Sequence, residues 1–128
     1  MGAPAAKQGD RVTAIDLHLV QPPTTAPPVT LPHPFSGILS QQLSADVRIM
    51  GMPAATVGSV AINTPPHIPQ GGTFVNPPDN RGTVKAGSGS VRIGGKAAAR
   101  AGDRAETCGE PTNPGGLVVA TGTVRIGG

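Results

Sequence analysis

Hydrophobic and polar residues alternate along short stretches of this chain, and no stretch keeps a helical spacing for long. Apolar residues alternate imperfectly with polar ones across residues 11–20, and Val60 and Ile62 flank a small residue in a second run. Alternation places every other side chain on one face of a strand. The pattern therefore predicts strands at residues 11–20 and 60–62, and residues 35–43 carry the only signal for a helical turn.

One alternating stretch is written three times. Its copies are residues 44–51, 88–95 and 121–128, and each contains the sequence Val-Arg-Ile followed by small residues. In a strand, the valine and isoleucine share one face and the arginine takes the other. The small residues that follow permit a tight bend. Each copy therefore predicts a short strand that ends in a turn.

A second block, rich in alanine, follows the first two copies directly, at residues 52–59 and 96–103. The third copy ends the chain, and the matching block stands at the other end, at residues 3–10. The sequence is thus a three-fold repeat that is divided inside one unit. A single unit cannot bury its own apolar face, so repeats stack or close into rings. The division predicts that the chain ends meet around a pseudo-three-fold axis, with the alanine pairs packed close to it.

Proline-rich segments separate these units. Residues 21–34, 64–72 and 110–116 are rich in proline, which fixes its own φ and has no backbone N–H to donate. The sequence therefore predicts long surface loops in these places. Together with the short strands they predict a single all-β domain over residues 1–128.

Composition changes this picture in one respect. The 128 residues include 19 glycines and 15 prolines, a share seen in disordered chains, but repeated apolar alternation is not a feature of disorder. A loop-rich fold of this size has a small core and needs a further crosslink. The single cysteine excludes an internal disulfide, so the crosslink must be of another kind.

Charge and aromatic content exclude one class of partner. The net charge is only +3, the basic residues are scattered, and the chain has no Trp or Tyr on which bases could stack. No nucleic-acid partner is therefore expected. The absence of an 18-residue apolar run or of a secretory signal favours synthesis in the cytoplasm.

The candidate metal ligands follow the repeat. His18 and His67 each lie eight residues after the end of their alanine-rich blocks, and Cys108 lies five residues after the third block. Three-fold closure would bring the loops that carry them together at one end of the axis. His33, in the first proline-rich segment, is the fourth candidate. Three imidazoles and a thiolate form a sound tetrahedral zinc site.

Two alternatives to a structural zinc site stay open. The four residues can be unrelated, as surface histidines and a small thiol. A catalytic site would require one ligand to leave; if His33 swings out, Asp16 or Glu106 is a nearby candidate for a base. Four protein ligands leave no open position for substrate, so the sequence favours a structural site and no enzyme.

The three repeated arginines are Arg48, Arg92 and Arg125. They can be solvated side chains on strand faces. A three-fold ring of identical charges would equally suit docking onto a three-fold symmetric partner, and the sequence alone leaves both interpretations open.

In combination these features resemble the PAAR-repeat proteins across residues 3–128. The tetrads Pro4-Ala5-Ala6-Lys7, Pro53-Ala54-Ala55-Thr56 and Ala97-Ala98-Ala99-Arg100 each differ by one residue from the family's naming sequence. The sequence Val-Arg-Ile-x-Gly stands just before two of them, and histidine-bearing proline-rich loops follow. The small residues that the motif needs are retained in all three.

This resemblance implies a cone or prism of short β-hairpins whose apex is tied by one structural Zn²⁺, bound by His18, His33, His67 and Cys108. It also implies that one copy caps a trimeric β-helical spike of the VgrG type, in type VI secretion or a related phage-like contractile injection system. The cap would sharpen the spike for puncture of a target membrane and would leave the cell with the particle.

Many members of the family carry toxin extensions, and none is expected here, so an effector cargo would be attached non-covalently. The alternative function is a free zinc-binding adaptor that docks an effector through its long loops, residues 21–34 and 64–82. The role of residues 21–43 stays open at this point.

Overall fold

The computed structural model describes residues 2–128, and within this range the chain is all β with no helix. Its strands in chain order are β1 (Ala3–Pro4), β2 (Arg11–Gln21), β3 (Val29–Gln41), β4 (Arg48–Ile49), β5 (Met52–Pro53), β6 (Val60–Asn63), β7 (Thr73–Phe74), β8 (Arg81–Val84), β9 (Arg92–Ile93), β10 (Lys96–Ala97), β11 (Arg104–Thr107), β12 (Asn113–Val119) and β13 (Arg125–Ile126). The described residues form no helix that is long and apolar enough to cross a membrane. The predicted fold class is confirmed.

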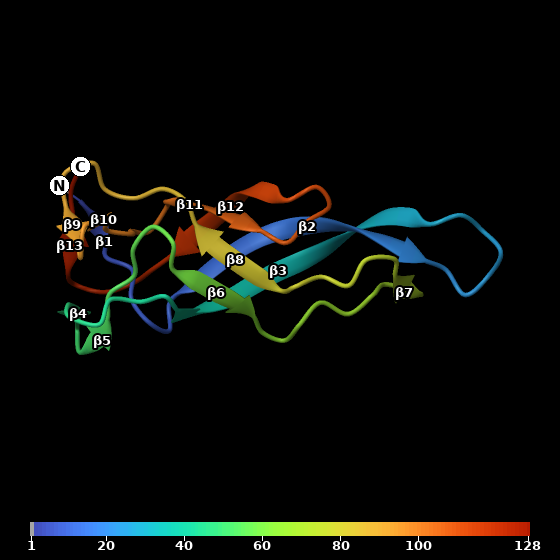
Figure 1. Ribbon diagram of the computed structural model, residues 1–128, viewed down its shortest axis with the longest axis horizontal. Coiled ribbons are helices and arrows are strands. Elements are labelled where there is room, and N and C mark those ends of the chain that lie inside the picture. Colours follow the sequence, from blue (N-terminus) through green and yellow to red (C-terminus); the bar gives the residue numbers. More distant parts are fainter. Residues whose placement is uncertain (1) are drawn as a thin grey trace.

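The molecule is elongated, and both ends of the chain lie together at one end of it, here called the base (Figure 1). There β1 pairs with β13, so that Ala3 faces Ile126 and Pro4 faces Arg125. The hairpins β4–β5 and β9–β10 have the same two-residue pairing. Each repeat unit thus supplies one short hairpin, and the third hairpin is completed by the two chain ends, as the divided repeat predicts.

A closed cycle of backbone hydrogen bonds joins the three units behind these hairpins. The N–H of Ala6 donates to the carbonyl of Ala99 over 2.9 Å, Ala99 donates to Ala55 over 3.0 Å, and Ala55 donates back to Ala6 over 3.0 Å. The three side chains are fully buried. Alanine is required here because a larger side chain from each unit would meet the other two near the axis.

A small apolar layer covers this cycle on the base side. Each unit contributes one alanine and one isoleucine to it, and these residues are Ala5, Ala54, Ala98, Ile49, Ile93 and Ile126. The isoleucines are those of the repeated Val-Arg-Ile stretch, so the alternation that marks the repeat also builds its core.

The remaining long strands form a closed sheet. Their order is β12-β11-β8-β6-β3-β2-β7, and β12 also pairs with β2, which closes the sheet into a small barrel. Phe35 and Leu39 of β3 and Val12 of β2 fill its interior. The β2–β3 hairpin runs from the pair Arg11–Ile38 to the pair Val20–Val29, and its tip projects beyond β7 (Figure 1).

One prediction for β3 is wrong. Residues 29–34 were expected in a loop, yet Val29–Gln41 is one continuous strand. Most of residues 35–43, which carry the only signal for a helical turn, belong to the same strand. The carbonyls of Ile15 and Leu17, opposite Pro34 and Pro32, point away from β3 and bond to other groups. The two prolines therefore turn their nitrogens toward the other edge of β3, which pairs with β6 only from Gly37 onward. Proline is tolerated on such an edge because no donor is needed there.

The third proline-rich loop is also shorter than predicted. Residues 110–116 were expected to form a loop, but β12 begins at Asn113 and pairs with β11. Pro114 lies within a stretch where the register between β11 and β12 shifts. Proline is found in sheets at bulges of this kind because the regular ladder is interrupted there.

Candidate metal centre

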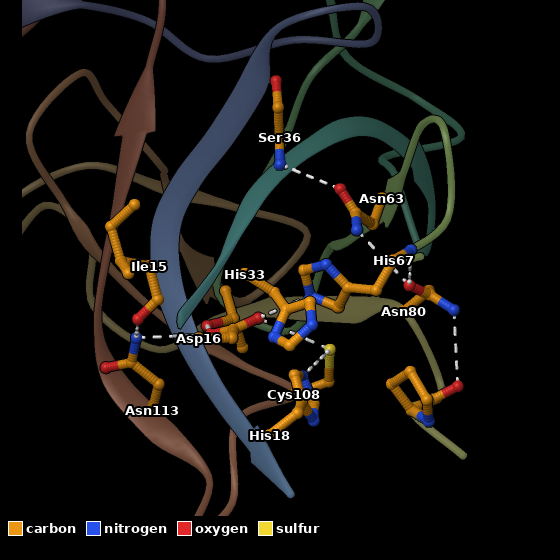
Figure 2. Close-up of polar contacts among 12 residues, drawn as sticks. Ile15, Asp16, His18, His33, Ser36, Asn63, His67, Asn80, Cys108 and Asn113 are labelled. Carbon is orange, nitrogen blue, oxygen red and sulfur yellow. Dashed lines mark hydrogen bonds and ion pairs between the residues drawn. The ribbon is translucent and has the colours of Figure 1, made fainter. Parts of the chain in front are cut away.

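The centre lies inside the barrel, at the end where β2 and β3 extend toward the tip of their hairpin. Along β2 the side chains of Asp16, His18 and Val20 are buried while those between them face outward. On β3, His33 is the cross-strand partner of Asp16. His67 comes from the loop after β6 and Cys108 from the residue after β11. Four segments distant in sequence therefore meet here (Figure 2).

Four side chains in this place can offer donor atoms to one ion. Asp16, His18, His67 and Cys108 each present one ligand atom, and these atoms all lie within 4.8 Å of one another. Three of the four predicted ligands belong to this group. His18 lies within the strand predicted at residues 11–20 and not on one of the loops that three-fold closure was expected to bring together. Asp16, considered from the sequence only as a base, completes the group.

His33, the remaining predicted ligand, lies beside this group. Its ring centroid is 5.5 Å from that of His18 and 5.7 Å from that of His67. Its Nδ1–H donates to the carbonyl of Leu31 over 2.9 Å, which leaves a lone pair on Nε2. Within residues 2–128, this Nε2 is the one buried side-chain nitrogen or oxygen without a hydrogen-bond partner. Such an atom is costly unless a ligand satisfies it, so His33 fits a metal ligand.

Glu110 fixes the orientation of His18. The Nδ1–H of His18 donates to Oε1 of Glu110 over 3.1 Å, which leaves Nε2 facing Sγ of Cys108 at 3.8 Å. Leu19 N–H and the Asn76 amide hold the same carboxylate at 3.2 and 2.9 Å. Burial opposes ionisation of Glu110, but these hydrogen bonds together lower its pKa. Histidine ligands of metals are commonly held by a carboxylate in this way.

The sequence reasoning missed Glu110. It follows Cys108 by two residues, but it binds a histidine 92 residues away through a loop whose path no spacing predicts. Asp16 did carry a signal. It stands two residues before His18 on a predicted strand, and this spacing puts both side chains on the same face.

The electrostatics of the group suit a cation. Burial, followed by the charge of Asp16 and its hydrogen bond, raises the pKa of the Cys108 thiol to about 12. Burial is also the main reason why the pKa of His67 is lowered, and the neighbouring histidines add to this effect. Without a cation the group therefore favours the thiol of Cys108 and the neutral imidazole of His67. A bound divalent cation would instead favour the thiolate form of Cys108, because metal ligation requires the thiolate.

A cleft of about 330 Å³ connects this group with solvent on one side. The residues that line it include His18, Cys108, Asp79, Glu106 and Thr112. Asp16 does not line the cleft and is fully buried. The centre therefore has a solvent-facing side at Cys108 and a sealed side at Asp16.

Comparison with known proteins adds one finding. Residues 21–109 match the family model described as the PAAR motif. The chain belongs to the PAAR-motif family. No curated protein matches the chain significantly. The match includes three of the four residues that the resemblance assigns to the metal. The fourth, His18, lies just before the matched range on β2.

The repeated arginines of this PAAR-motif protein are far from the metal centre, at the base. Arg48, Arg92 and Arg125 are exposed, and each guanidinium donates to a backbone carbonyl of its own hairpin. The acceptors are Gly51, Gly95 and Gly2, at 3.0, 3.2 and 2.9 Å. The three side chains thus have equivalent conformations around the axis.

Proposed function

We propose that this PAAR-motif protein is the tip of a contractile injection system, and that one copy caps a trimeric β-helical spike of the VgrG type. The observation that carries this proposal is the closed hydrogen-bond cycle of Ala6, Ala55 and Ala99. This cycle makes the base of a single chain nearly three-fold symmetric. Only a base of this symmetry can offer equivalent contacts to each of three identical subunits.

The surface of the base suits such a partner. Val47, Val124 and Met50 are 37%, 40% and 54% exposed, and the arginines Arg48 and Arg125 lie beside them. Exposed apolar side chains that gather on one surface commonly mark a binding site. Because each arginine is already held by its own hairpin, little conformational freedom would be lost when the base docks.

A structural zinc ion held by His18, His33, His67 and Cys108 is part of this proposal. When bound, Zn²⁺ supplies a crosslink and no redox chemistry. The donors come from β2, β3, the loop after β6 and the end of β11, so they tie all three repeat units together at the end opposite the base. This crosslink would replace the disulfide that a chain with one cysteine cannot form. A rigid tip is the property that membrane puncture requires.

The alternative is an adaptor that docks an effector through its long loops. One observation favours it: Ile68 is 70% exposed and Val75 is 44% exposed, both on the segment between β6 and β8. The two functions are compatible, since this segment lies away from the base (Figure 1).

The proposal is tested by mixing the protein with the trimeric spike subunit of the same contractile system. Native mass spectrometry should give one copy of this chain per three spike subunits. Reversal of the repeated charges, in the triple variant Arg48→Glu, Arg92→Glu and Arg125→Glu, should abolish this complex.

The matched control reverses three exposed arginines of the barrel wall, Arg11, Arg81 and Arg104. This variant has the same net charge as the first and should keep the complex. Absence of a complex with the unmodified protein, or equal loss in both triple variants, would contradict capping through the base. Retention of an effector without any spike complex would favour the adaptor.

A further inference from the structure

We propose that Asp16 is itself a metal ligand, which makes this centre a five-donor site of three histidines, one cysteine and one carboxylate. The inference rests on the metal crosslink of the proposed function and adds a residue that the family resemblance does not assign.

The position of the carboxylate is that of a donor. Oδ2 of Asp16 lies 3.1 Å from Nε2 of His67 and 3.4 Å from Sγ of Cys108. Zinc bonds of about 2.0 Å to nitrogen or oxygen and 2.3 Å to sulfur, at the 90–120° angles of five-coordination, separate neighbouring donor atoms by about 2.8–3.7 Å. The spacing of these three atoms is therefore close to the spacing around a shared ion.

The other carboxylate oxygen is held in place. Oδ1 accepts hydrogen bonds from the hydroxyl of Thr107 and from Nδ2 of Asn113, the latter over 3.3 Å. One oxygen is thus occupied by neutral donors of the barrel wall, and the other points at His67 and Cys108 (Figure 2). Supporting groups that fix one oxygen of a carboxylate are typical of metal ligands.

Comparison with Glu110 shows that this arrangement is specific. Glu110 uses Oε1 for Nδ1 of His18 and for Leu19 N–H, and Oε2 for Asn76. Its oxygens therefore contact the outer ring nitrogen of His18 and two groups outside the cluster, and it orients a ligand without facing the shared donor atoms. Asp16 instead directs a carboxylate oxygen at the donor atoms themselves.

The charge balance of the centre also requires an anion. A divalent ion with one thiolate and three neutral imidazoles carries a net charge of +1. Burying such a charge without a partner is unfavourable. His18, His33 and Asp16 are each no more than 1% exposed, so solvent does not screen the charge on the sealed side of the centre. The carboxylate of Asp16 brings the net charge of the centre to zero.

The consequence concerns which ions the site accepts. Four-coordinate sites of nitrogen and sulfur suit zinc, whereas a further carboxylate oxygen suits ions that tolerate higher coordination numbers, such as Co²⁺. We therefore expect five-coordinate Co²⁺ in the unmodified protein, whose visible absorption is weaker than that of tetrahedral cobalt.

The test compares cobalt-loaded protein with two variants. Asp16→Asn keeps the size of the side chain and removes its charge. It should convert the weak visible absorption of five-coordinate cobalt to the intense absorption of tetrahedral cobalt. It should also lower zinc affinity by at least about 100-fold, the upper end of what the loss of an outer hydrogen-bond partner costs. Glu106→Gln removes a carboxylate from the cleft wall and should change neither quantity, which separates ligation from a general effect of charge.

X-ray absorption of the unmodified zinc protein gives an answer that does not depend on how a variant folds. Five donors, one sulfur and four nitrogen or oxygen atoms, would support the assignment. Four donors, or a tetrahedral cobalt spectrum that Asp16→Asn leaves unchanged, would overturn it. Each of these outcomes leaves the spike-tip function intact. By contrast, unmodified protein that binds neither zinc nor cobalt would contradict the metal crosslink itself.

Discussion

The base and the metal centre are built from the same three units, yet they differ in how far the units resemble one another. At the base each unit supplies the same hairpin, the same alanine in the hydrogen-bond cycle and the same arginine contact. At the metal centre the first unit supplies Asp16, His18 and His33, and the other units supply His67 and Cys108. Symmetry is kept where the proposed partner is symmetric, and it is lost where a single ion must be bound.

The largest expected effect comes from breaking the metal centre. Cys108→Ser should abolish zinc binding and lower the unfolding free energy by at least about 2–5 kcal/mol, as loss of a disulfide does in small domains. Structural zinc sites contribute still more in peptides that fold around the ion. Metal analysis and chemical denaturation measure both effects.

Chelation provides the matched control for this variant. Unmodified protein stripped of metal should unfold at the same denaturant concentration as Cys108→Ser, because both have lost the same crosslink. If the stripped protein instead kept the stability of the loaded one, the ion would not be the crosslink between the three units.

A second effect, somewhat smaller, comes from breaking the base. Ala55→Leu inserts a larger side chain at the axis, where Ala55 is fully buried beside Ala6 and Ala99. Overpacking of this kind costs about 1–3 kcal/mol. Denaturation of the zinc-loaded variant measures the loss, and it should leave metal content unchanged.

The control for overpacking is Ala26→Leu, at an exposed position on the β2–β3 turn. It adds the same side chain without filling the core, so it should change the unfolding free energy by no more than about 0.5 kcal/mol. Equal losses in the two variants would mean that the axis is not tightly packed.

A third prediction concerns Glu110. It distinguishes a residue that orients a metal ligand from a residue that binds the metal itself. Glu110→Gln should keep the fold and lower zinc affinity by about 10–100-fold, because His18 loses a charged hydrogen-bond acceptor. Competition with a chelator measures the change. Asn76→Ala removes a partner of the carboxylate only, so its effect on zinc affinity should be smaller and in the same direction.

The difference between the two regions also explains what could be predicted from the sequence. The base could be predicted almost completely, because the repeat itself records which residues are equivalent and the divided unit requires the ends to meet. His18, His67 and Cys108 could be brought together by the same register. The strand β3 could not, since Pro32 and Pro34 argue for a loop and only the absence of a neighbouring strand at that edge makes them acceptable.

The acidic residues of the metal centre mark the limit of this reasoning. Asp16 stands on the same strand face as His18, so its position was predictable but its part in the donor group was not. Glu110 reaches His18 through a loop and could not be predicted at all. Equivalence between units was informative for the base and was no guide to residues that occur in one unit alone.

The smallest expected effect tests whether the base is energetically as symmetric as its hydrogen bonds. Gly9, Gly58 and Gly102 occupy the same position in the three alanine-rich blocks and have φ values of 91°, 96° and 88°. An added Cβ would meet nothing within 4 Å at any of them, so only the backbone conformation opposes alanine. Each substitution by alanine should therefore cost about 1–2 kcal/mol, the penalty of the left-handed region. If the base is symmetric, the three single variants should agree within about 0.5 kcal/mol when unfolding of the zinc-loaded protein is measured. A loss confined to one unit would show that the symmetry of the backbone conceals unequal stability, and that the unit concerned limits the rigidity of the whole base.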